Sequence, residues 1–321
     1  MIDNTIEISI VVCVFNEEDN VKPLINQIHA ALIGLSYEII YVDDGSTDQT
    51  LDAIRANIDH RIKVLTLRKN YGQSLALMAG IDAAQGNYIV TMDGDLQNDP
   101  SDIPAMLKIS KEHNWDLVAG IRKNRQDNVL FRKIPSKIAN FIIRRSSGVE
   151  IKDYGCTLKL FKKEIAKDLG LYGELHRFIP VLANLEGATI TQMEVKHHER
   201  VHGTSKYGMG RTIKVMSDLV LMIFFKKYLQ KPMHLFGNWG VMIFLLGVLI
   251  NIYMLWLKVE GQDIWGKPLM LVGILFVMTG IQLITFGIFV ELQMRTYYES
   301  QNKRPYRVRQ IYQATRTEPV G

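Results

Sequence analysis

The fold of this chain is decided by the stretch Asn87-Tyr88-Ile89-Val90-Thr91-Met92-Asp93-Gly94-Asp95-Leu96-Gln97, an apolar run that ends in two carboxylates one residue apart. The apolar part predicts a buried strand, and carboxylate oxygens at its end suit hard divalent cations such as Mg²⁺ or Mn²⁺. Such ions commonly arrive with a phosphate-bearing substrate. A solvated turn after a strand would look the same in sequence, because a bare D-x-D occurs often by chance. The stretch alone therefore leaves a metal–nucleotide site and a plain turn both open.

Outward from this strand, short apolar runs alternate with helical stretches over residues 7–120. We expect strands at residues 8–14, 37–42, 63–67, 88–92 and 116–120, and helices at residues 21–35, 50–56, 74–84 and 103–111. This rhythm predicts an α/β fold, a Rossmann-like and mostly parallel sheet with helices on both faces. In such sheets, ligands bind beyond the carboxyl ends of the strands.

Three clusters of acidic or amide side chains follow predicted strands at that edge. They are Asn16 with Glu17, Asp43 with Asp44, and Asp93 with Asp95. Three independent clusters at one edge are far less expected by chance than one. The convergence therefore favours a ligand site over three unrelated turns.

The net charge of +5 conceals a strong asymmetry along the chain. The first 120 residues carry 8 Lys and Arg against 18 Asp and Glu, whereas the remaining residues carry 30 against 15. An acidic first part suits cation binding, and a basic second part suits phosphate, anionic lipid or nucleic acid. The basic residues cluster around apolar stretches without an aromatic-rich basic platform, so we expect no nucleic-acid partner.

Two uncharged runs, residues 233–257 and 268–290, are long enough to cross a membrane as helices. At about 1.5 Å per residue, each exceeds a hydrocarbon core of about 30 Å. The short connector between them predicts a hairpin, although a buried helical pair of a soluble protein would have a similar composition. Lys and Arg flank both outer ends. The positive-inside rule therefore predicts a multi-pass membrane protein with its N-terminal domain and tail in the cytoplasm.

These features divide the chain into four predicted parts. They are a cytoplasmic α/β domain at residues 1–205, juxtamembrane amphipathic helices at 206–232, the transmembrane hairpin at 233–291 and a basic cytoplasmic tail at 292–321. Within the first part, residues 130–145 mix apolar and basic residues at helical spacing and are expected to lie on anionic membrane lipids. An ordinary amphipathic helix with a solvated basic face is the alternative.

Several other kinds of site lose support from the motifs. No G-x-G-x-x-G follows the first strand, and no G-x-x-x-x-G-K-[ST] is present, so dinucleotide and P-loop sites are not expected. The run His198-Glu199-Arg200-Val201-His202 matches the zinc-protease pattern H-E-x-x-H. That chemistry needs both histidines on one helical face. Residues 188–195 alternate like a strand and Gly203 follows the motif at once, so proteolysis is not expected.

Longer stretches carry a resemblance that the acidic clusters alone do not. They are NYGQ at 70–73, AGI at 79–81, DLQN at 95–98, NRQD at 124–127, DYGC at 153–156, RFIPVLAN at 177–184 and G-x-SKY at 203–207. With the acidic clusters, they resemble glycosyltransferase family 2, inverting enzymes of the GT-A fold that use nucleotide sugars. Within that family the whole chain is similar to the polyprenyl-phosphate glycosyltransferases, a group that includes dolichyl-phosphate mannose synthases and undecaprenyl-phosphate 4-deoxy-4-formamido-L-arabinose transferases.

The resemblance implies a reaction. A sugar would move, with inversion, from a UDP-sugar to undecaprenyl phosphate or a related polyprenyl phosphate at the cytoplasmic membrane face. The lipid-linked monophosphate sugar would serve an envelope glycan or the lipid A of lipopolysaccharide. The resemblance also implies Mg²⁺ or Mn²⁺ as cofactor and a homo-oligomer, for example a tetramer. A membrane-bound scaffold that binds nucleotide sugars without turnover is the alternative.

The resemblance, with the basic residues near the matched motifs, also implies roles for individual side chains. The expected metal ligands are Asp93, Asp95 and Gln97, and the expected nucleotide-sugar-binding residues are Asn16, Glu17, Asp43, Asp44 and Asp93. The expected acceptor-phosphate residues are Arg122, Arg125, Arg132 and Ser205, and the expected catalytic residues are Asp95, Asp153, Arg200 and Lys206. Lipid headgroups are the alternative partners of Arg132, Arg200 and Lys206. A phosphate acceptor with a second pKa of about 6 is already ionised at neutral pH. Positioning should therefore matter more than a general base.

Overall fold

The computed structural model describes residues 6–122, 150–199 and 231–300, together with residues 221, 224 and 228. The chain divides into two compact units, Met1–Ile223 and Phe224–Gly321. The predicted interfacial helix at 130–145 lies outside the described residues, as do nearly all of the juxtamembrane stretch and most of the basic tail. Their structures stay predictions.

The first unit is built on one sheet. Its strands are β1 (Ile8–Val14), β2 (Tyr37–Asp43), β3 (Ile62–Thr66), β4 (Tyr88–Asp93), β5 (Leu117–Arg122), β6 (Lys159–Lys162) and β7 (Ile190–Val195). They lie in the order β3-β2-β1-β4-β6-β5-β7. β6 runs antiparallel to its neighbours β4 and β5, and the other neighbouring pairs are parallel. The prediction of a mostly parallel sheet is confirmed.

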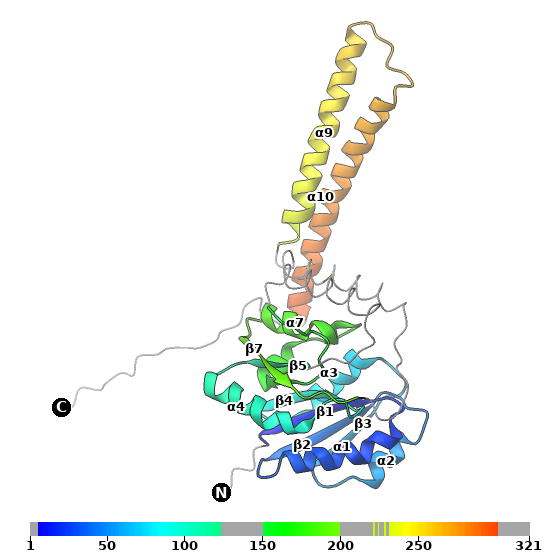
Figure 1. Ribbon diagram of the computed structural model, residues 1–321. Helices are drawn as coiled ribbons and strands as arrows, with labels where there is room; N and C mark the ends of the chain where they lie inside the picture. The colour runs from blue at the N-terminus through cyan, green and yellow to red at the C-terminus, as the bar shows by residue number, and fades with distance from the viewer. Residues whose placement is uncertain are drawn as a thin grey trace, which may run out of the picture. The chain divides into compact units, whose positions relative to one another are not determined.

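Helices cover both faces of this sheet (Figure 1). One face packs against α1 (Glu18–Ala31), α2 (Thr50–Ala56) and α4 (Ile103–His113), with the short 3-10 turn η1 (Pro100–Asp102) beside α1. The other face carries α3 (Gln73–Ala83), with α6 (Lys163–Asp168) and the 3-10 turn η2 (Leu175–Phe178) packed against it, and α7 (Ile179–Leu185).

The side-chain alternation of β1 shows how the sequence sets the two faces. Ile10 and Val12 join the buried core cluster that contains Leu24 of α1. Val11, between them, faces α3, because a Cβ added at Gly80 of that helix would overlap a methyl group of Val11. Successive side chains of a strand point to opposite faces, so an unbroken apolar run is what a strand buried on both faces requires.

Among the described strands, β6 is the one that the sequence does not predict, since β7 falls within the alternating stretch at residues 188–195. It inserts between β4 and β5, which are consecutive parallel candidates in the sequence, and Leu160 pairs with both Val90 and Val118. Because β6 is antiparallel, its first residue lies at the edge where β4 and β5 end. The loop that precedes β6 therefore reaches the same edge as Asp93.

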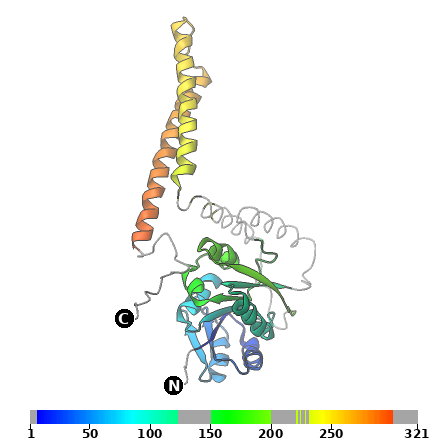
Figure 2. The ribbon, with the colours of Figure 1, turned by 90° about the vertical axis from the view of Figure 1, so that its left-hand side faces the viewer.

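The second unit contains a long helical hairpin (Figures 1 and 2). Its helices are α9 (Met233–Val259) and α10 (Pro268–Ser300), which match the two predicted spans and extend beyond them. Both have a mean hydropathy of 2.3 over the most apolar window, of which only 17% and 11% is buried. By length and composition both can span a membrane, and outward apolar side chains such as Leu249, 62% exposed, are what lipid contact requires.

Glycines let the two helix backbones approach each other closely. A Cβ at Gly247 would lie 2.6 Å from the backbone N of Val277, and a Cβ at Gly280 would lie 2.7 Å from the backbone N of Phe244. Without a hydrophobic driving force between helices in lipid, such close van der Waals packing is a main source of helix association. The hairpin is therefore specified by small residues at the contact, not by its apolar character alone.

We expect Gly280→Leu to weaken the hairpin. The added side chain overlaps backbone atoms of α9, and overpacking of this kind costs roughly 1–3 kcal/mol. Thermal unfolding of the detergent-solubilised protein should show a lower midpoint for this variant. Ile281→Leu is the matched control, because Ile281 is the next residue of α10 and its side chain is 52% exposed. This control should keep the wild-type midpoint. Equal midpoints for both variants would contradict the close contact.

Candidate active site

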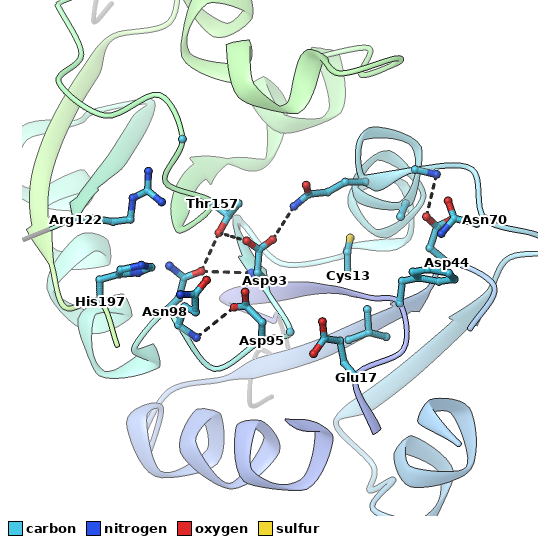
Figure 3. Close-up of a pocket in the computed structure, with 18 residues that line it drawn as sticks. Cys13, Glu17, Asp44, Asn70, Asp93, Asp95, Asn98, Arg122, Thr157 and His197 are labelled. Carbon is cyan, nitrogen blue, oxygen red and sulfur yellow. Dashed lines mark hydrogen bonds between the residues drawn. The ribbon is translucent and has the colours of Figure 1, made fainter. Parts of the chain in front are cut away.

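A pocket of about 400 Å³ opens at the carboxyl ends of β1 and β4, the edge at which the sequence predicts a ligand site. Figure 3 shows Asp93 and Asp95 near its centre, Glu17 and Asp44 on one side, and Arg122 and His197 on the other. Its lining comes from the ends of β1, β4 and β5, from the loops after β1, β2, β3, β4 and β7, from the first turn of α3 and from the loop before β6. The fold thus brings together the three acidic clusters and segments up to residue 197.

Asp44 binds the loop before α3 with both carboxylate oxygens. Its Oδ1 accepts the N–H of Tyr71 at 2.7 Å, and its Oδ2 accepts the N–H of Gly72 at 2.9 Å. Burial raises the pKa of Asp44 above its ordinary value, and the charge of Asp43 acts in the same direction, while the two backbone donors oppose the rise. Asp44 lines the pocket, so the predicted nucleotide contact is compatible with its position.

Asn16 and Asp43 lie beside the pocket and are not among its lining residues. Asp43 is buried and accepts the N–H of Ser46 at 3.0 Å. Asn16, in the left-handed region with φ of 55°, accepts the N–H of Thr47 at 2.8 Å and donates its own backbone N–H to Ser46 Oγ at 3.0 Å. In this structure Asn16 joins the loop after β1 to the loop after β2, whereas the Asp43 carboxylate holds the turn of its own loop. A direct contact with the nucleotide stays a prediction for them.

Asp93 is held on both sides. Gln73 Nε2 donates to Oδ1 at 2.6 Å, and Thr157 Oγ1 donates to Oδ2 at 2.9 Å. Burial and, after it, the neighbouring charge of Asp95 raise the pKa of Asp93 to about 6. Neither Gln73 nor Thr157 is among the residues predicted from the sequence. Gln73 is the last residue of the stretch NYGQ, and Thr157 directly follows the stretch DYGC. These two stretches are the features of the sequence that could have pointed to Gln73 and Thr157.

Asp95 and Gln97 line the pocket next to Asp93. Between them, Leu96 adopts a left-handed conformation with φ of 61°, and Asp95 Oδ1 accepts the N–H of Gln97 at 3.2 Å. Asp95 is only 5% exposed. The loop continues into Asn98, which pairs with His197 through an isolated β-bridge. The predicted metal ligands thus stand together on one short loop.

Arg122 and Asp153 form one unit. Arg122 Nε donates to Oδ2 at 2.7 Å and Nη2 donates to Oδ1 at 2.9 Å, a two-point pairing of guanidinium and carboxylate. Both side chains are mostly buried, and Arg122 lines the pocket whereas Asp153 does not. Gly155 makes room for the pair, because a Cβ there would lie 2.8 Å from Arg122 Nη2. Asp153 therefore orients Arg122 in this structure, and a chemical role for Asp153 stays a prediction.

A buried cation near the pocket, Lys159 at the start of β6, is also absent from the residues predicted from the sequence. Lys159 is 2% exposed, and its ammonium donates to the carbonyl of Cys156. Burial lowers the pKa of Lys159, whereas the neighbouring Cys156, Asp153 and Asp93 oppose that change. No motif marks it, since a lysine that opens a short strand is ordinary in sequence. Lys159 thus brings a buried amine close to the acidic residues of the pocket, in surroundings where burial disfavours its charged form.

The oxygen-rich lining suits a divalent cation. Glu17, Asp44, Asp93 and Asp95 line the pocket, and among the described residues Arg122 is the one Lys or Arg side chain that does so. A diphosphate is repelled by such a lining unless a cation accompanies it. Within the described ranges no three Asp, Glu, His or Cys form a preformed metal cage. Two carboxylates, with phosphate oxygens and water, are a common arrangement for Mg²⁺.

The described part of the zinc-protease-like motif is not helical. His198 and Glu199 lie in an irregular segment after β7, and His198 Nε2 lies 3.2 Å from Asp99 Oδ2. The paired histidines of a zinc protease need consecutive helical turns. These residues do not provide the start of one, in line with the prediction.

Five predicted site residues lie outside the described residues. They are Arg125, Arg132, Arg200, Ser205 and Lys206. Four of the five are basic, and all five are assigned from the sequence to the acceptor phosphate or to catalysis. Their roles stay predictions.

Comparison with known proteins assigns the chain to a family. The family model for glycosyl transferase family 2 matches residues 9–170. The chain belongs to glycosyl transferase family 2. The dodecaprenyl-phosphate galacturonate synthase of Rhizobium johnstonii is 44% identical over 316 residues, which cover 96% of this chain and 94% of that protein. The undecaprenyl-phosphate 4-deoxy-4-formamido-L-arabinose transferase of Yersinia pestis is 35% identical over 319 residues, covering 97% and 95%.

These near-complete matches place the chain among the polyprenyl-phosphate sugar transferases of glycosyl transferase family 2. It is thus an enzyme, a glycosyltransferase, and the scaffold alternative loses its support. Solved structures agree on the fold. Glucosyl-3-phosphoglycerate synthase from Mycobacterium tuberculosis, determined with Mn²⁺, uridine diphosphate and phosphoglyceric acid, matches with a TM-score of 0.54 at 18% identity over 68% of this chain and 78% of that one. The likeness shows a shared GT-A fold.

We expect Mn²⁺ binding to weaken as the pH falls through about 6. Below that pH a proton competes with the metal ion for the Asp93 carboxylate, whose pKa is raised to about 6.

The raised pKa of Asp93 also makes the stability of the metal-free protein depend on pH. An unfolded Asp has a pKa of about 3.9, so Asp93 contributes stability that is present below about pH 4 and lost as the pH rises through about 6. Asp93→Asn should therefore stabilise the metal-free protein at pH 8 and leave it unchanged near pH 4. Mn²⁺ titrations from pH 5 to 8 and thermal unfolding at both pH values check these outcomes. An Mn²⁺ affinity that does not change with pH would contradict the first prediction, and equal stability of Asp93→Asn and the wild type at pH 8 would contradict the second.

Proposed function

We propose that this enzyme transfers a sugar from a UDP-sugar to undecaprenyl phosphate or a related polyprenyl phosphate at the cytoplasmic face of the inner membrane. The observation that carries the proposal is the acidic pocket at the strand edge, built from the loops that hold Asp44, Asp93 and Asp95. Its relatives are named for the transfer of sugars to dodecaprenyl and undecaprenyl phosphate.

The donor would lie across the pocket from Asp44 to Asp95. Glu17 and Asp44 suit the hydroxyl and N–H donors of a ribose and a uracil, because carboxylate oxygens accept hydrogen bonds. Asp95, with Asp93 and Gln97, would hold Mg²⁺ or Mn²⁺ on the diphosphate. The cation would neutralise the charge that develops on the departing UDP as the bond from the sugar C1 to its phosphate oxygen breaks. Asp93 would position this loop through its contacts with Gln73 and Thr157.

The acceptor would approach from the side of Arg122. A polyprenyl phosphate oxygen forms the new bond to C1 on the face opposite the leaving UDP, which inverts the configuration. Arg122 would attract the acceptor phosphate while Asp153 keeps the guanidinium in place. The predicted basic residues Arg125, Arg132, Arg200 and Lys206, with Ser205, would add contacts to the phosphate or to anionic lipids.

The hairpin supports a membrane location. α9 and α10 are apolar and long enough to span it, and the Lys and Arg residues outside both ends favour a cytoplasmic active site. A lipid acceptor requires such a location, because its prenyl chain stays in the bilayer. The proposed domain boundaries follow: residues 1–205 for catalysis, 206–232 at the membrane surface, 233–291 for the hairpin and 292–321 for the tail. A homo-oligomer and a product used for envelope glycan or lipid A modification also remain predictions.

Turnover of a donor panel tests this function. Purified protein in detergent is given undecaprenyl phosphate, Mn²⁺ or Mg²⁺, and in turn UDP-galacturonate, UDP-4-deoxy-4-formamido-L-arabinose, UDP-glucose and UDP-N-acetylglucosamine. We expect nucleotide release with one donor class that requires both the lipid and the metal. The names of the two relatives put the first two donors first. Release that is the same without the lipid would overturn the proposed acceptor.

A further inference from the structure

The segment Tyr71–Ser74 touches both acidic halves of the pocket. The backbone N–H groups of Tyr71 and Gly72 donate to Asp44, on the side proposed for the nucleoside. The very next side chain, Gln73, donates to Asp93 Oδ1 at 2.6 Å, on the side proposed for the metal. Asp44 directly follows β2 and Asp93 ends β4. The segment Tyr71–Ser74 is therefore a short covalent connection between the Asp44 side and the Asp93 side of the pocket.

The segment is anchored at its α3 end by Ser74. Gly72 has φ of 92° and precedes the first turn of α3, and Ser74, in that turn, is fully buried. Ser74 Oγ lies 2.8 Å from Nδ1 of His176 on η2 and accepts the backbone N–H of His176 at 3.1 Å. A shift of the backbone at residues 71–72 therefore reaches Gln73 directly, while Ser74 keeps the rest of α3 in place.

The hydrogen bond to the other oxygen of Asp93 comes from a different part of the chain, which does not contact Asp44 in the described hydrogen bonds. Thr157 Oγ1 lies 2.9 Å from Asp93 Oδ2 and 2.8 Å from Asn98 Oδ1, and Asn98 belongs to the same loop as Asp95. This contact comes from the loop before β6. Figure 3 shows Cys13 between Asp44 and Asp93, so the two carboxylates do not meet directly across the pocket floor. Among the described hydrogen bonds, the one from Gln73 completes the connection from the Asp44 side of the pocket to the Asp93 side.

We infer that Gln73 is a positioning residue that couples nucleoside binding to metal binding. A nucleoside seated against Asp44 restricts the loop that Asp44 holds. Restricting that loop fixes the Gln73 amide and with it the orientation of the Asp93 carboxylate beside the metal. The cost of ordering these groups is then shared by the two ligands, so each binds more tightly in the presence of the other. The inference rests on the proposed function, since it places the uridine of the donor at Asp44.

The test measures Mn²⁺ affinity with and without saturating uridine, by electron paramagnetic resonance of free Mn²⁺, on the full-length protein in detergent. Uridine has no phosphate to contact the metal, so any coupling must pass through the protein. In the wild type we expect uridine to tighten Mn²⁺ binding about three- to tenfold, and Mn²⁺ to tighten uridine binding by the same factor, as linkage requires. Gln73→Met keeps the length of the side chain and removes the amide. It should bind each ligand alone and show a coupling factor near one.

Two further variants separate this role from general damage. Thr157→Val removes the other hydrogen bond to Asp93, so it should weaken Mn²⁺ binding and keep the coupling. Gln27→Met, an exposed position on α1, should change neither. If the coupling persists in Gln73→Met, the role of Gln73 is overturned. The same holds if the wild type binds both ligands without coupling. Neither result would touch the proposed function. A wild type that does not bind uridine would overturn the proposed donor class and the inference with it.

Discussion

Asp95→Asn should reduce turnover by roughly three orders of magnitude while the protein stays folded. The variant keeps the shape of the side chain and its acceptance of the Gln97 N–H, but it removes the charge that would hold the cation on the donor diphosphate. Electrostatic stabilisation of a leaving group by a metal is worth several kcal/mol, and about 4 kcal/mol corresponds to a thousandfold in rate. The rate should be measured at saturating donor, since the loss is in the chemical step.

The matched control for this variant is Asp99→Asn in the same loop. Asp99 does not line the pocket, and it makes a surface ion pair with Lys196 and caps η1 through the N–H of Ser101. An asparagine at position 99 can still accept that N–H. We expect less than a threefold change in rate. Comparable losses in the two variants would mean that Asp95 acts through the loop and not through the metal.

Gly45→Ala should destabilise the first unit by about 3 kcal/mol and abolish uridine binding. Gly45 has φ of 73°, and an added Cβ would lie 2.6 Å from the carbonyl carbon of Lys69 and 2.8 Å from the backbone N of Asn70. Left-handed backbone costs an alanine roughly 1–2 kcal/mol, and the overlap with main-chain atoms adds to it. The loop that Asp44 holds would be pushed away from it.

Gly34→Ala separates these two costs. Gly34 has a similar φ of 84°, but no atom lies within 4 Å of an added Cβ. It should therefore show the backbone cost alone, about 1–2 kcal/mol, and bind uridine like the wild type. Denaturant unfolding and uridine titration of both variants give the comparison. Equal destabilisation by the two substitutions would contradict the close contact between the loops after β2 and β3.

The sequence predicts the parts of this fold that depend on local pattern. The strands around Val11, Ile40 and Val90 are apolar on both faces, and their order along the chain implies a parallel sheet. The place of β6 does not follow from pattern. It is four residues long and includes the buried Lys159, and its position depends on pairing with two strands that end far from it in sequence.

The site divides in the same way. Asp44, Asp93 and Asp95 are predictable because each carboxylate follows a strand whose end is known. Gln73 and Thr157 are not, because their roles arise from hydrogen bonds to Asp93 across 20 and 64 residues of sequence. A matched stretch such as NYGQ or DYGC marks the neighbourhood of such residues but not the atom that each one contacts.

The identity of the nucleotide released during turnover distinguishes the proposed transfer of a sugar from a transfer of a sugar phosphate to the same lipid. The wild-type protein is incubated with the accepted UDP-sugar, Mn²⁺ and undecaprenyl phosphate, and the nucleotide and the lipid product are quantified by chromatography and mass spectrometry. We expect one UDP released for each lipid-linked sugar monophosphate formed, because the bond that breaks joins the sugar C1 to the donor diphosphate. Release of UMP with a lipid-linked sugar diphosphate would contradict the proposed transfer.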